Sequence, residues 1–501
     1  MAAETEVLVI GAGPSGLFAA LELARHGHRS RIVERDPQPH RQARATAVQP
    51  GTLEILARAG LVERLLAASQ HLHFARVFDA ELQLLGEMPF AGVGSRWEHQ
   101  CSLPQWRTEE ILRDALGERG VMVERGVTAG SLYARDGGIL AELRHADGSA
   151  EMVETRYVIG AGGARSVTRT SLEQELAGGT YPGTALVADV AVDCAVPRDN
   201  TALIATPAGY VVLAALPNRR WITFVGDLHD DERERLGRDR SPASVAAAIK
   251  RRISGSLELR DVSWAALFRM HSRMSAVLAD GRRFLLGDAG HLSSPFAGAG
   301  LNCGIHDGHN LAWKLALTLQ RRARPCLLES FAVEREQANR HALEVADRLH
   351  ASALAAVDAA RTGARTSART PEQVTEIMRS RSMLDVSYAA SPIVSRLEHD
   401  GDGATGAAGP GAGQRDPRAL RPTIRHTIRL CGRPPRDRVF ARLHDRWQGL
   451  VAVEHEPTAP DGVTLVRPDG HVGFHSARAD AEALAALDAH LGGYLIPRPV
   501  A

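Results

Sequence analysis

The sequence predicts an α/β protein with a parallel sheet near its N-terminus, an antiparallel sheet in its middle and a small α/β unit at its C-terminus. Residues 1–50 alternate strand, helix and strand patterns, and residues 201–226 hold three strand-like runs separated by turns. Residues 401–413 consist almost entirely of small, turn-forming residues, which is typical of a linker. A chain of 501 residues has room for several domains of ordinary size.

The N-terminal segment has the pattern of a compact βαβ unit. Residues 6–10 form a short apolar run typical of a buried strand, residues 15–26 have the apolar period of an amphipathic helix, and residues 30–34 form a second apolar run. Two consecutive strands joined by a helix usually run in the same direction, so we expect a parallel sheet here.

Glycines occupy the junction between the first predicted strand and the first predicted helix. Gly11, Gly13 and Gly16 form a GxGxxG pattern around Ser15, and Glu34 ends the second strand. The missing side chains allow a tight turn and let a pyrophosphate reach the helix N-terminus, while the acid can accept hydrogen bonds from a ribose. The pattern predicts a Rossmann-like dinucleotide site. The alternative is a glycine-rich turn without a ligand.

Antiparallel strands are predicted in the middle of the chain. Residues 201–206, 209–216 and 220–226 are strand-like, and short turns containing proline separate them. Residues 284–286 then have the pattern of a buried strand and residues 306–320 that of a helix. Because α/β character returns after the antiparallel strands, the first domain is expected to be discontinuous.

These patterns divide the chain into four parts. Residues 1–170 and 280–400 would form the discontinuous dinucleotide-binding domain, with a helical pattern over its last fifty residues or so. Residues 171–279 would form the antiparallel sheet domain, residues 401–413 the linker, and residues 414–501 a separate unit. The elements expected in that unit are a helix from residue 438, a strand at 450–453, a hairpin over 463–474 and a final helix.

Charge and cysteine content narrow the classes of function. Sixty Lys and Arg residues against 59 Asp and Glu residues leave a net charge of +1, which offers no field to collect nucleic acid or an anionic membrane. The five cysteines form no CxxC pair, which removes support for disulfide-reductase chemistry and is typical of a reducing compartment. The N-terminus does not resemble a signal peptide and no apolar run is long enough to span a bilayer, so we expect a cytoplasmic protein.

A second glycine-rich segment follows the strand predicted at 284–286. It contains Asp288 within Gly-Asp-Ala-Gly-His, and then Pro295, Gly298 and Asn302 before a helix. A strand that ends on an acid before such a loop can place a carboxylate on a polyol and backbone N–H groups on an electron-rich ring. Together with the N-terminal turn, these residues resemble the FAD-dependent aromatic hydroxylases, which are single-component flavoprotein monooxygenases. The resemblance spans nearly the whole chain and is closest to the phenol and polyketide hydroxylase branch, which has a thioredoxin-like C-terminal domain.

The resemblance implies FAD as the cofactor and a role for each matching residue. The N-terminal turn would hold the pyrophosphate, Glu34 and Arg35 would lie beside the adenosine, and Asp288 would hold the ribityl chain. Arg44 and Gln105 match residues beside the flavin, and the loop after Asp288 would line the isoalloxazine ring. The implied cofactor residues are Gly11, Gly13, Ser15, Gly16, Glu34, Arg35, Arg44, Gln105, Asp288, Pro295, Gly298, Gly300, Leu301 and Asn302.

One family segment departs from the usual pattern. Residues 160–166 read Gly-Ala-Gly-Gly-Ala-Arg-Ser and are followed by Arg169, so Gly162 stands where the family usually has an aspartate. Ala299 stands where the family often has a glutamine. Because that aspartate helps to link pyrophosphate and nicotinamide binding in the family, its loss implies altered binding of the reductant. A neutral replacement is the alternative.

The resemblance also implies a reaction. NADPH or NADH would reduce the bound FAD, oxygen would add to form a flavin C4a-hydroperoxide, and one oxygen atom would pass to the ring of a phenolic or polyketide-type substrate. No catalytic side chain is assigned, because the chemistry belongs to the cofactor while the protein supplies orientation and a water-poor pocket. The alternatives are an FAD-dependent dehydrogenase, a Baeyer–Villiger type oxygenase on the same scaffold, and a non-catalytic flavin-binding module.

The substrate pocket is expected between the antiparallel sheet domain and the flavin ring. Tyr210 and Val212 share one face of a strand, Phe224 lies on the next strand, and the resemblance places Pro295 and Phe296 near the flavin. Either face of the strands could be the pocket side. For each of these side chains an ordinary core position is the alternative.

No metal site, nucleic-acid partner or membrane partner is expected, and both a monomer and a homodimer remain open. His291, His306 and His309 lie across the loop and helix that the resemblance assigns to flavin binding. His71 and His73 alternate like exposed positions of a strand. The expected partners are a small aromatic substrate and molecular oxygen.

Overall fold

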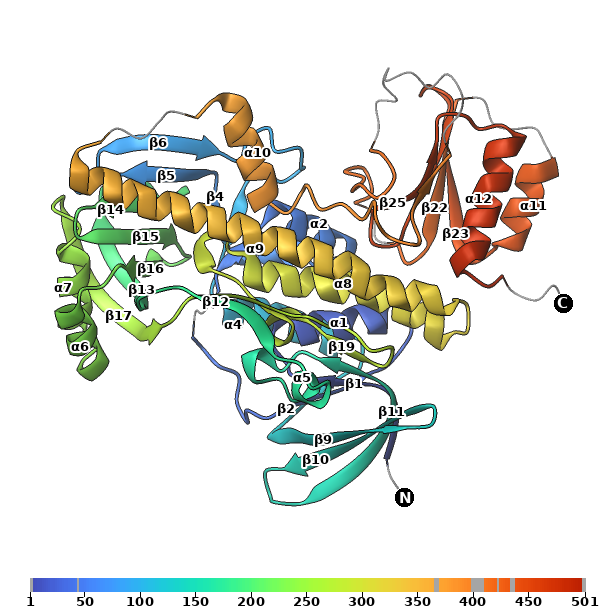
Figure 1. Cartoon of the computed structure of the whole chain (residues 1–501), viewed down its shortest axis with the longest axis horizontal. Coiled ribbons are helices and arrows are strands. Elements are labelled where there is room, and N and C mark those ends of the chain that lie inside the picture. The colour runs from blue at the N-terminus through green and yellow to red at the C-terminus, as the bar shows by residue number, and fades with distance from the viewer. Residues whose placement is uncertain are drawn as a thin grey trace.

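The protein is seen in a computed structural model that describes residues 3–42, 45–364, 369–397, 410–420, 423–432 and 438–497. In Figure 1 the N-terminal sheet lies at the bottom, an antiparallel sheet at the left and the C-terminal unit at the upper right. Two long helices, α8 (Ala299–Leu319) and α9 (Pro325–Thr362), run between these parts and connect them.

A seven-stranded sheet organises the N-terminal part of the chain. Its strands are β1 (Ala3–Ile10), β2 (Arg31–Glu34), β8 (Val123–Arg125), β9 (Val127–Arg135), β10 (Gly138–His145), β11 (Ala150–Gly160) and β19 (Arg283–Leu285). Strand β1 pairs in parallel with β2 and β11, and β11 pairs in parallel with β19. The helices around it are α1 (Pro14–Arg25), α2 (Pro50–Arg58), α3 (Val62–Ala68), α4 (Gln105–Gly117) and α5 (Val167–Ser171).

Alternation along β1 separates two cores. Val7 and Val9 pack with α1, α4 and α8, whereas Leu8 and Ile10 pack with β9 and β10. Successive side chains of a strand point to opposite faces, so β1 is buried on both sides. The predicted βαβ unit, the late parallel strand and the helix after it are all present, although α8 begins at Ala299 rather than at residue 306.

A second seven-stranded sheet carries the predicted antiparallel strands. In order across the sheet its strands are β17 (Leu257–Phe268), β13 (Ala185–Cys194), β16 (Arg220–Gly226), β15 (Gly209–Ala215), β14 (Asn200–Thr206), β5 (Phe74–Phe78) and β6 (Leu84–Pro89). Strands β14, β15 and β16 form the antiparallel meander that the sequence predicts. Because β5 and β6 precede residue 171, the sheet extends beyond the span of 171–279 that the sequence analysis gave it.

The two faces of the second sheet have different neighbours. Helices α6 (Asp230–Arg238) and α7 (Pro242–Lys250) pack Leu236, Val245 and Ile249 against one face. Helix α9 packs against β14 and β15, and its residue Val357 joins a cluster with Tyr210 on the other face. That other face is therefore turned toward the second glycine-rich segment.

Two short three-stranded sheets connect the larger ones. The first has the order β3 (Ala47–Val48), β7 (Gln100–Ser102) and β4 (Gln70–Leu72), with antiparallel pairing on both sides of β7. The second has the order β12 (Leu176–Thr180), β18 (His271–Ser275) and β20 (His291–Leu292). The first takes its strands from residues 47–102 and the second from residues 176–292.

The helical pattern expected over the end of residues 280–400 extends only part of the way. Helix α9 ends at Thr362, where Gly363 adopts a left-handed φ of 69°, and α10 follows over Pro371–Arg381. The described residues from 382 to 397 contain turns and the short strand β21 (Ser395–Arg396). Among all the described residues, none of the helices is long and apolar enough to cross a membrane.

The C-terminal unit is a small α/β structure. Its elements are β22 (His426–Cys431), α11 (Arg438–Arg446), β23 (Val451–Glu456), β24 (Gly462–Val466), β25 (Val472–Ser476) and α12 (Ala481–Tyr494). With β21 they give a sheet of order β21-β25-β24-β22-β23. The expected helix, strand, hairpin and final helix are present, and β22 is a strand that the sequence analysis missed. Residues 401–409 of the predicted linker lie outside the described residues, and the likeness to thioredoxin stays a prediction.

Candidate functional site

The turn between β1 and α1 is a tight backbone junction with one open position. Gly11 has a φ of 109°, and a Cβ there would lie 2.4 Å from the carbonyl oxygen of Ala161. A Cβ at Gly16 would lie 2.0 Å from the Gly11 carbonyl oxygen, whereas a Cβ at Gly13 would meet nothing within 4 Å. Gly13 also precedes α1 without a side-chain cap. An anion can therefore approach the first turn of α1 over Gly13.

Ser15 connects this turn to the second glycine-rich segment. A Cβ added at Gly287 would lie 2.3 Å from the Ser15 hydroxyl oxygen, and one added at Gly304 would lie 2.0 Å from it. Glycine at both positions is therefore what allows α1 to pack this closely against α8. The resemblance implied a cofactor role for Ser15, and the structure places its side chain in this packing contact.

Glu34 lies at the end of β2, beside the glycine turn. Its carboxylate accepts a 2.8 Å hydrogen bond from the backbone N–H of Ala12 and a 3.0 Å hydrogen bond from that of Asp36. Arg35 is exposed, with its Nε 4.0 Å from the Asp36 carboxylate. The acid is thus held where a ribose of a dinucleotide on the turn would lie. Arg44 lies outside the described residues.

The second glycine-rich segment brings the end of β19 to the start of α8. Asp288 is exposed in the turn after β19, and its Oδ1 lies 3.9 Å from the position that a Cβ would take on Gly300. Pro295 begins a short 3₁₀ turn, and Gly298 adopts a left-handed φ of 63° before α8. Leu301 is largely buried on the first turn of the helix. The segment therefore exposes a carboxylate and the N-terminus of α8 at one place.

Asn302 fixes the conformation of this segment. Its Nδ2 donates to the carbonyl oxygens of Ala47, at 2.9 Å, and Gly298, at 2.6 Å. Its Oδ1 accepts a 2.9 Å hydrogen bond from the backbone N–H of Gln49. Two of these bonds tie α8 to β3 and the residue after it, and the bond to Gly298 lies at the start of α8, so Asn302 positions the loop that the resemblance assigns to the flavin ring.

The segment of residues 160–169, which departs from the family pattern at Gly162, lies next to both glycine-rich segments. Arg169 donates from Nη1 to the carbonyl oxygen of Ala289 at 3.1 Å and from Nη2 to that of Ala164 at 2.6 Å. Gly162 has an ordinary φ of −76°, and a Cβ there would have its nearest neighbour at 3.8 Å. The backbone therefore accepts a side chain at residue 162, and the absence of the family aspartate is not a steric necessity.

Gln105 is the first residue of α4. Its Nε2 donates a 2.8 Å hydrogen bond to Oε1 of Glu109, one turn further along the helix. Burial raises the pKa of Glu109, while the hydrogen bond from Gln105 acts in the opposite direction. The side chain of Gln105 is thus engaged with its own helix in the described structure.

A buried ionic network around Asp307 holds α8 and the second glycine-rich segment together. Asp307 on α8 accepts hydrogen bonds from the backbone N–H of Gly287 at 2.9 Å and from Arg335 at 2.8 Å, and it lies 2.8 Å from Nε2 of His291. Burial alone would raise the pKa of Asp307, but His291 and Arg335 together hold it below its usual value. His309 similarly lies 2.9 Å from the buried carboxylate of Glu22. These histidines are partners of carboxylates that hold α8 in place.

One face of the antiparallel sheet meets the second glycine-rich segment. The rings of Tyr210 and Phe296 pack edge to face with centroids 5.3 Å apart, and Val212 joins the same cluster. His350 of α9 stacks on Phe296 with centroids 4.5 Å apart and an angle of 11°. The structure thus shows which face of β15 is turned toward Pro295: the face with Tyr210 and Val212.

Phe224 continues this face on the next strand. Val212 pairs directly with Phe224 on β16 and with Leu203 on β14, and all three side chains are half-buried. Residues directly opposite each other in an antiparallel pair share a face. A row of partly exposed apolar side chains therefore crosses the sheet beside the loop that begins at Pro295.

Four polar residues near this face were not found from the sequence: Tyr181, Ser272, Asp347 and His350. The Tyr181 hydroxyl donates to Asp347, whose other oxygen accepts a 2.9 Å hydrogen bond from the Ser272 hydroxyl. The Tyr181 ring lies 4.4 Å from that of His350. Asp347 and His350 are three residues apart, so they share a face of α9. That spacing is visible in the sequence, but nothing there shows that α9 crosses the antiparallel sheet.

The comparison with protein families agrees with this geometry. The family model described as "FAD binding domain" matches residues 4–346. The chain therefore belongs to this family of FAD-binding proteins, and the glycine turn, Glu34 and Asp288 all lie within the matched span.

Individual relatives are monooxygenases and hydroxylases by name. The chain is 34% identical over 336 residues to the 6-methylpretetramide 4-monooxygenase of Streptomyces rimosus. The aligned region covers 66% of this chain and 59% of that protein. It is 28% identical over 351 residues to the pentachlorophenol 4-monooxygenase of Sphingobium chlorophenolicum, covering 70% and 65% respectively. The chain thus spans less than two thirds of the length of these relatives.

A solved structure shows that the fold likeness covers the whole chain. Aklavinone-11 hydroxylase in a ternary complex with FAD and aklavinone superposes with a TM-score of 0.79 and 24% identity over 98% of both chains. The C-terminal unit is therefore part of the shared fold.

The described residues fit FAD. The open position over Gly13 leaves space for a pyrophosphate at the N-terminus of α1. Glu34 is held beside that turn by two backbone N–H groups, and Asp288 is exposed where β19 and α8 meet. Gly298 and Gly300 leave the N-terminus of α8 without side chains that would cover it. These groups supply the donor and acceptor types that a dinucleotide with a polyol chain requires.

Proposed function

We propose that this chain is an FAD-dependent, NAD(P)H-using monooxygenase that hydroxylates an aromatic ring of a phenolic or polyketide-type substrate. The observation that carries the proposal is the packing of Tyr210, Phe296 and His350 against the glycine-rich segment of an FAD-binding fold. A planar apolar substrate would gain free energy by stacking and by burying apolar area on the half-buried side chains beside this cluster, Phe296, Val212 and Phe224. The names of the relatives, two monooxygenases and a hydroxylase, support the same class of reaction.

The residues of the chain would bind and orient, while the cofactor supplies the redox chemistry. Bound FAD would take electrons from NADPH or NADH and would activate molecular oxygen for transfer to the substrate. Gly13 would leave room for the pyrophosphate, Glu34 would accept hydrogen bonds from the adenosine ribose, and Asp288 would accept them from the ribityl chain. The position of Asn302 would keep the flavin-side loop in one conformation.

The substrate would lie on the apolar row of the antiparallel sheet. Leu203, Val212 and Phe224 are half-buried there and would exclude water from the reacting ring. The Nδ1 atom of His350 is buried without a hydrogen-bond partner among the described residues, and burial lowers the pKa of this histidine. A neutral His350 would thus be able to exchange a hydrogen bond with a substrate hydroxyl.

A second candidate function is a flavin-binding protein that no longer uses a nicotinamide. Gly162 favours it, because this residue replaces the family aspartate although the backbone would accept a side chain. A dehydrogenase or a Baeyer–Villiger type oxygenase would use the same scaffold and would be recognised by its product.

Turnover of the purified yellow protein tests the proposal. Reactions under ¹⁸O₂ would follow the consumption of NADPH and NADH with a panel of phenols and polycyclic quinones. The mass of each product would then be measured by mass spectrometry. We expect at least one substrate to stimulate consumption and to gain one labelled oxygen atom. A product without added oxygen would indicate a dehydrogenase, and a ring-expanded ester would indicate a Baeyer–Villiger type oxygenase.

The His350→Phe variant, which keeps the stacking on Phe296 and removes the polar nitrogen, serves as a matched comparison. We expect it to retain flavin and its basal NADPH oxidation while it loses substrate stimulation. If neither NADPH nor NADH reduces the flavin with any substrate of the panel, the monooxygenase proposal is contradicted and the flavin-binding protein remains.

A further inference from the structure

Two short segments that are distant in the sequence carry metal-binding side chains in the same alternating pattern. One is His71-x-His73 and the other is His99-x-Cys101. Strand β4 pairs antiparallel with β7 so that His71 lies directly opposite Cys101 and Leu72 opposite Gln100. His73 and His99 each lie one residue beyond this pairing, and their rings are close to each other. Residues directly opposite each other in an antiparallel pair share a face, so His71 and Cys101 belong to one face of the pair.

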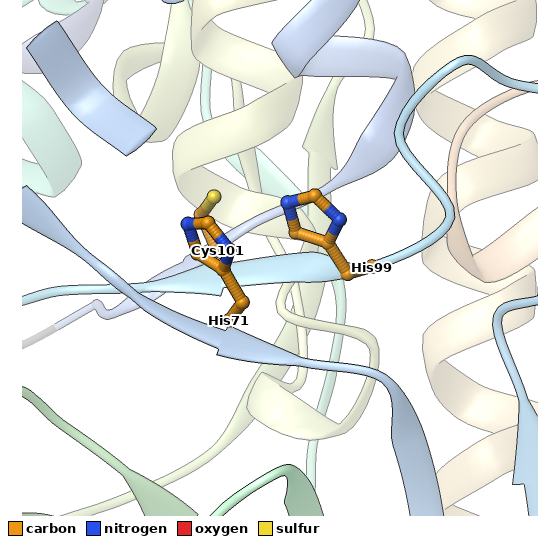
Figure 2. Close-up of side chains that lie close together, drawn as sticks. All are labelled: His71, His99 and Cys101. Carbon is orange, nitrogen blue, oxygen red and sulfur yellow. The ribbon is translucent and has the colours of Figure 1, made fainter. Parts of the chain in front are cut away.

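The distances agree with this placement. One nitrogen of His71, one nitrogen of His99 and the Cys101 sulfur lie within 4.8 Å of one another. Figure 2 shows these three side chains on the same side of the paired strands. The rings of His71 and His99 are 4.4 Å apart, and the ring of His73 is 5.4 Å from that of His99. Three potential ligands therefore gather at one point, and the ring of a fourth, His73, lies beside that of His99.

We propose that His71, His73, His99 and Cys101 bind a zinc ion. Imidazole nitrogen and cysteine sulfur are the ligands that zinc prefers, and four protein ligands are typical of a structural zinc site. Zinc bonds of about 2.0 to 2.3 Å place tetrahedral ligand atoms roughly 3.5 Å apart, so side-chain rotations must bring the atoms of His71, His99 and Cys101 together by about 1 Å. The side chain of His73 must also turn toward these three to complete the set. Binding would displace the proton of the Cys101 thiol to solvent and form a zinc–thiolate bond.

The surroundings of the four residues suit this role. Nε2 of His71 lies 3.2 Å from the carbonyl oxygen of Leu66, so a proton on Nε2 donates there and leaves the Nδ1 lone pair for the metal. Nε2 of His99 is buried and has no hydrogen-bond partner among the described residues, an arrangement that a metal bond would satisfy. Cys101 is a buried free thiol, while His73 is exposed and gives an ion access from solvent.

The proposed site lies on the face of the small sheet that is turned away from the flavin-side loop. Val48 is the partner of Cys101 in β3, whereas its neighbours Ala47 and Gln49 belong to the other face. Gln49 donates a 2.9 Å hydrogen bond to the carbonyl oxygen of Ala297, within that loop. The zinc ion would therefore join β4 to β7 as a structural clip and would take no part in the chemistry of the flavin.

Zinc binding is tested on the full-length protein without a histidine tag. After treatment with a chelator and dialysis against equimolar zinc chloride, zinc per chain is measured by plasma mass spectrometry. We expect about one zinc ion per chain in the wild type and in the control variants Cys194→Ser and His444→Ala. The double variant His99→Gln with Cys101→Ser should lose it, and His73→Ala should bind zinc more weakly.

A second measurement separates loss of the site from loss of the fold. Zinc should raise the Tm of the wild type and of both controls, because an ion that binds only the folded chain stabilises it, and it should leave the Tm of the double variant unchanged. The single variant His99→Gln keeps a half-buried polar side chain and is examined in the same way. A wild type that retains no zinc, a double variant that retains as much as the wild type, or an anomalous scattering peak away from these residues would each overturn the proposal.

Discussion

Gly162 is the residue at which this chain departs from the family pattern in the segment that is followed by Arg169. Its backbone has an ordinary φ of −76°, and no atom lies within 3.8 Å of the place where a Cβ would stand. The backbone geometry therefore does not require glycine at this position. Arg169, in the same segment, still reaches the carbonyl oxygen of Ala289 in the second glycine-rich segment.

Restoring an acid at residue 162 tests this interpretation. Because the site has room for the side chain, we expect Gly162→Asp to fold with a free energy of unfolding within about 0.5 kcal/mol of the wild type. If the lost acid matters for the reductant, the rate of flavin reduction by NADPH should rise, as measured by anaerobic stopped-flow absorption. Gly163→Asp is the control, because Gly163 has a φ of 72° that disfavours any side chain. An unchanged apparent nicotinamide affinity and reduction rate would contradict a role for the missing aspartate.

Asp288 is the residue on which we expect flavin retention to depend most. A hydrogen bond to a charged group contributes about 1.5–3 kcal/mol, so Asp288→Ala should weaken FAD binding by roughly 10- to 100-fold. The ratio of bound flavin to protein after gel filtration checks this. The matched control is Asp280→Ala. Asp280 lies eight positions before Asp288 in the chain, and its exposed carboxylate pairs with Arg283. Full flavin occupancy in the Asp288 variant would refute the assigned role.

At the scale of one element, the turn between β1 and α1 contains glycines that the packing requires and one glycine, Gly13, that the packing does not require. A Cβ at Gly16 would overlap the Gly11 carbonyl oxygen, whereas a Cβ at Gly13 would enter open space. Gly13 also has an extended backbone, with a φ of −74°, that any residue can adopt. The GxGxxG pattern alone does not distinguish these two kinds of position.

The two glycines therefore respond differently to substitution with alanine. We expect Gly16→Ala to lower the free energy of unfolding by at least about 2 kcal/mol, because backbone atoms must move apart. Gly13→Ala should change it by less than about 0.5 kcal/mol and yet weaken FAD binding, since the methyl group enters the space for the pyrophosphate. Urea unfolding and flavin titration together measure both effects. Equal loss of stability in the two variants would show that Gly13 is a structural residue as well.

At the scale of the whole molecule, a buried ionic cluster joins the C-terminal unit to α8 and α9. Arg467 donates to both oxygens of Glu334, at 2.7 and 2.8 Å, and Lys314 donates to Glu334 at 2.7 Å. Asp469 also pairs with Arg467 and accepts a 3.2 Å hydrogen bond from the Trp313 indole. All the charged side chains are almost completely buried. The C-terminal unit is thus bound to the flavin-binding part by charges that would be costly to expose separately.

Removal of one member of this cluster should be far more damaging than removal of a surface ion pair. Arg467→Ala would leave buried carboxylates without their main partner, and we expect a loss of about 3–5 kcal/mol in the free energy of unfolding. Arg446→Ala removes a half-exposed pair with Asp488 in the same unit and should cost less than about 1 kcal/mol. Urea denaturation of both variants makes the comparison. Similar losses in the two would show that the cluster does not hold the units together.

Buried histidines make the stability of the molecule depend on pH. Burial, with the charge of Arg467, lowers the pKa of His426 to about 3, and its ring packs edge to face on Trp313 at 5.4 Å. An unfolded histidine binds a proton below pH 6.5 or so, while the folded one does not, so stability falls as the pH drops below that value. The slope per such histidine is about 1.4 kcal/mol per pH unit.

Urea unfolding at pH 7.5 and at pH 5.0 measures this dependence. We expect His426→Phe, which keeps a ring against Trp313, to reduce the loss of stability between the two values. His444→Ala removes an exposed histidine and should leave the loss unchanged. An unaltered pH dependence in His426→Phe would mean that other groups carry the effect. Below about pH 4, protonation of carboxylates such as Asp307, whose pKa the fold lowers, should remove further stability.

Much of this structure is local in its cause, and the sequence therefore determined it. The βαβ unit, the meander of β14, β15 and β16, the hairpin of β24 and β25 and the glycine turn before α1 all follow from short-range patterns of apolar residues, glycine and turn residues. The resemblance of the sequence motifs to those of the FAD-dependent aromatic hydroxylases added the prediction of FAD and of the residues expected around it. Strand β22 and the end of α9 at Thr362 were not predicted, although Gly363 after the helix and the alternation of Ile428 and Leu430 in the strand are local signals that could have shown them.

Contacts between distant segments were decided only by the tertiary structure. The face of β15 that meets Phe296 depends on where α9 crosses the sheet, and a period of two gives both faces equal weight. His350 and Asp347 join that face from a helix more than a hundred residues later. In the same way, His71 and His73 alone resemble exposed strand positions, but the pairing of β7 with β4 brings His71 into a cluster with His99 and Cys101, and the ring of His73 lies beside that of His99. Pairing of this kind depends on the packing free energy of the whole chain, which no local pattern contains.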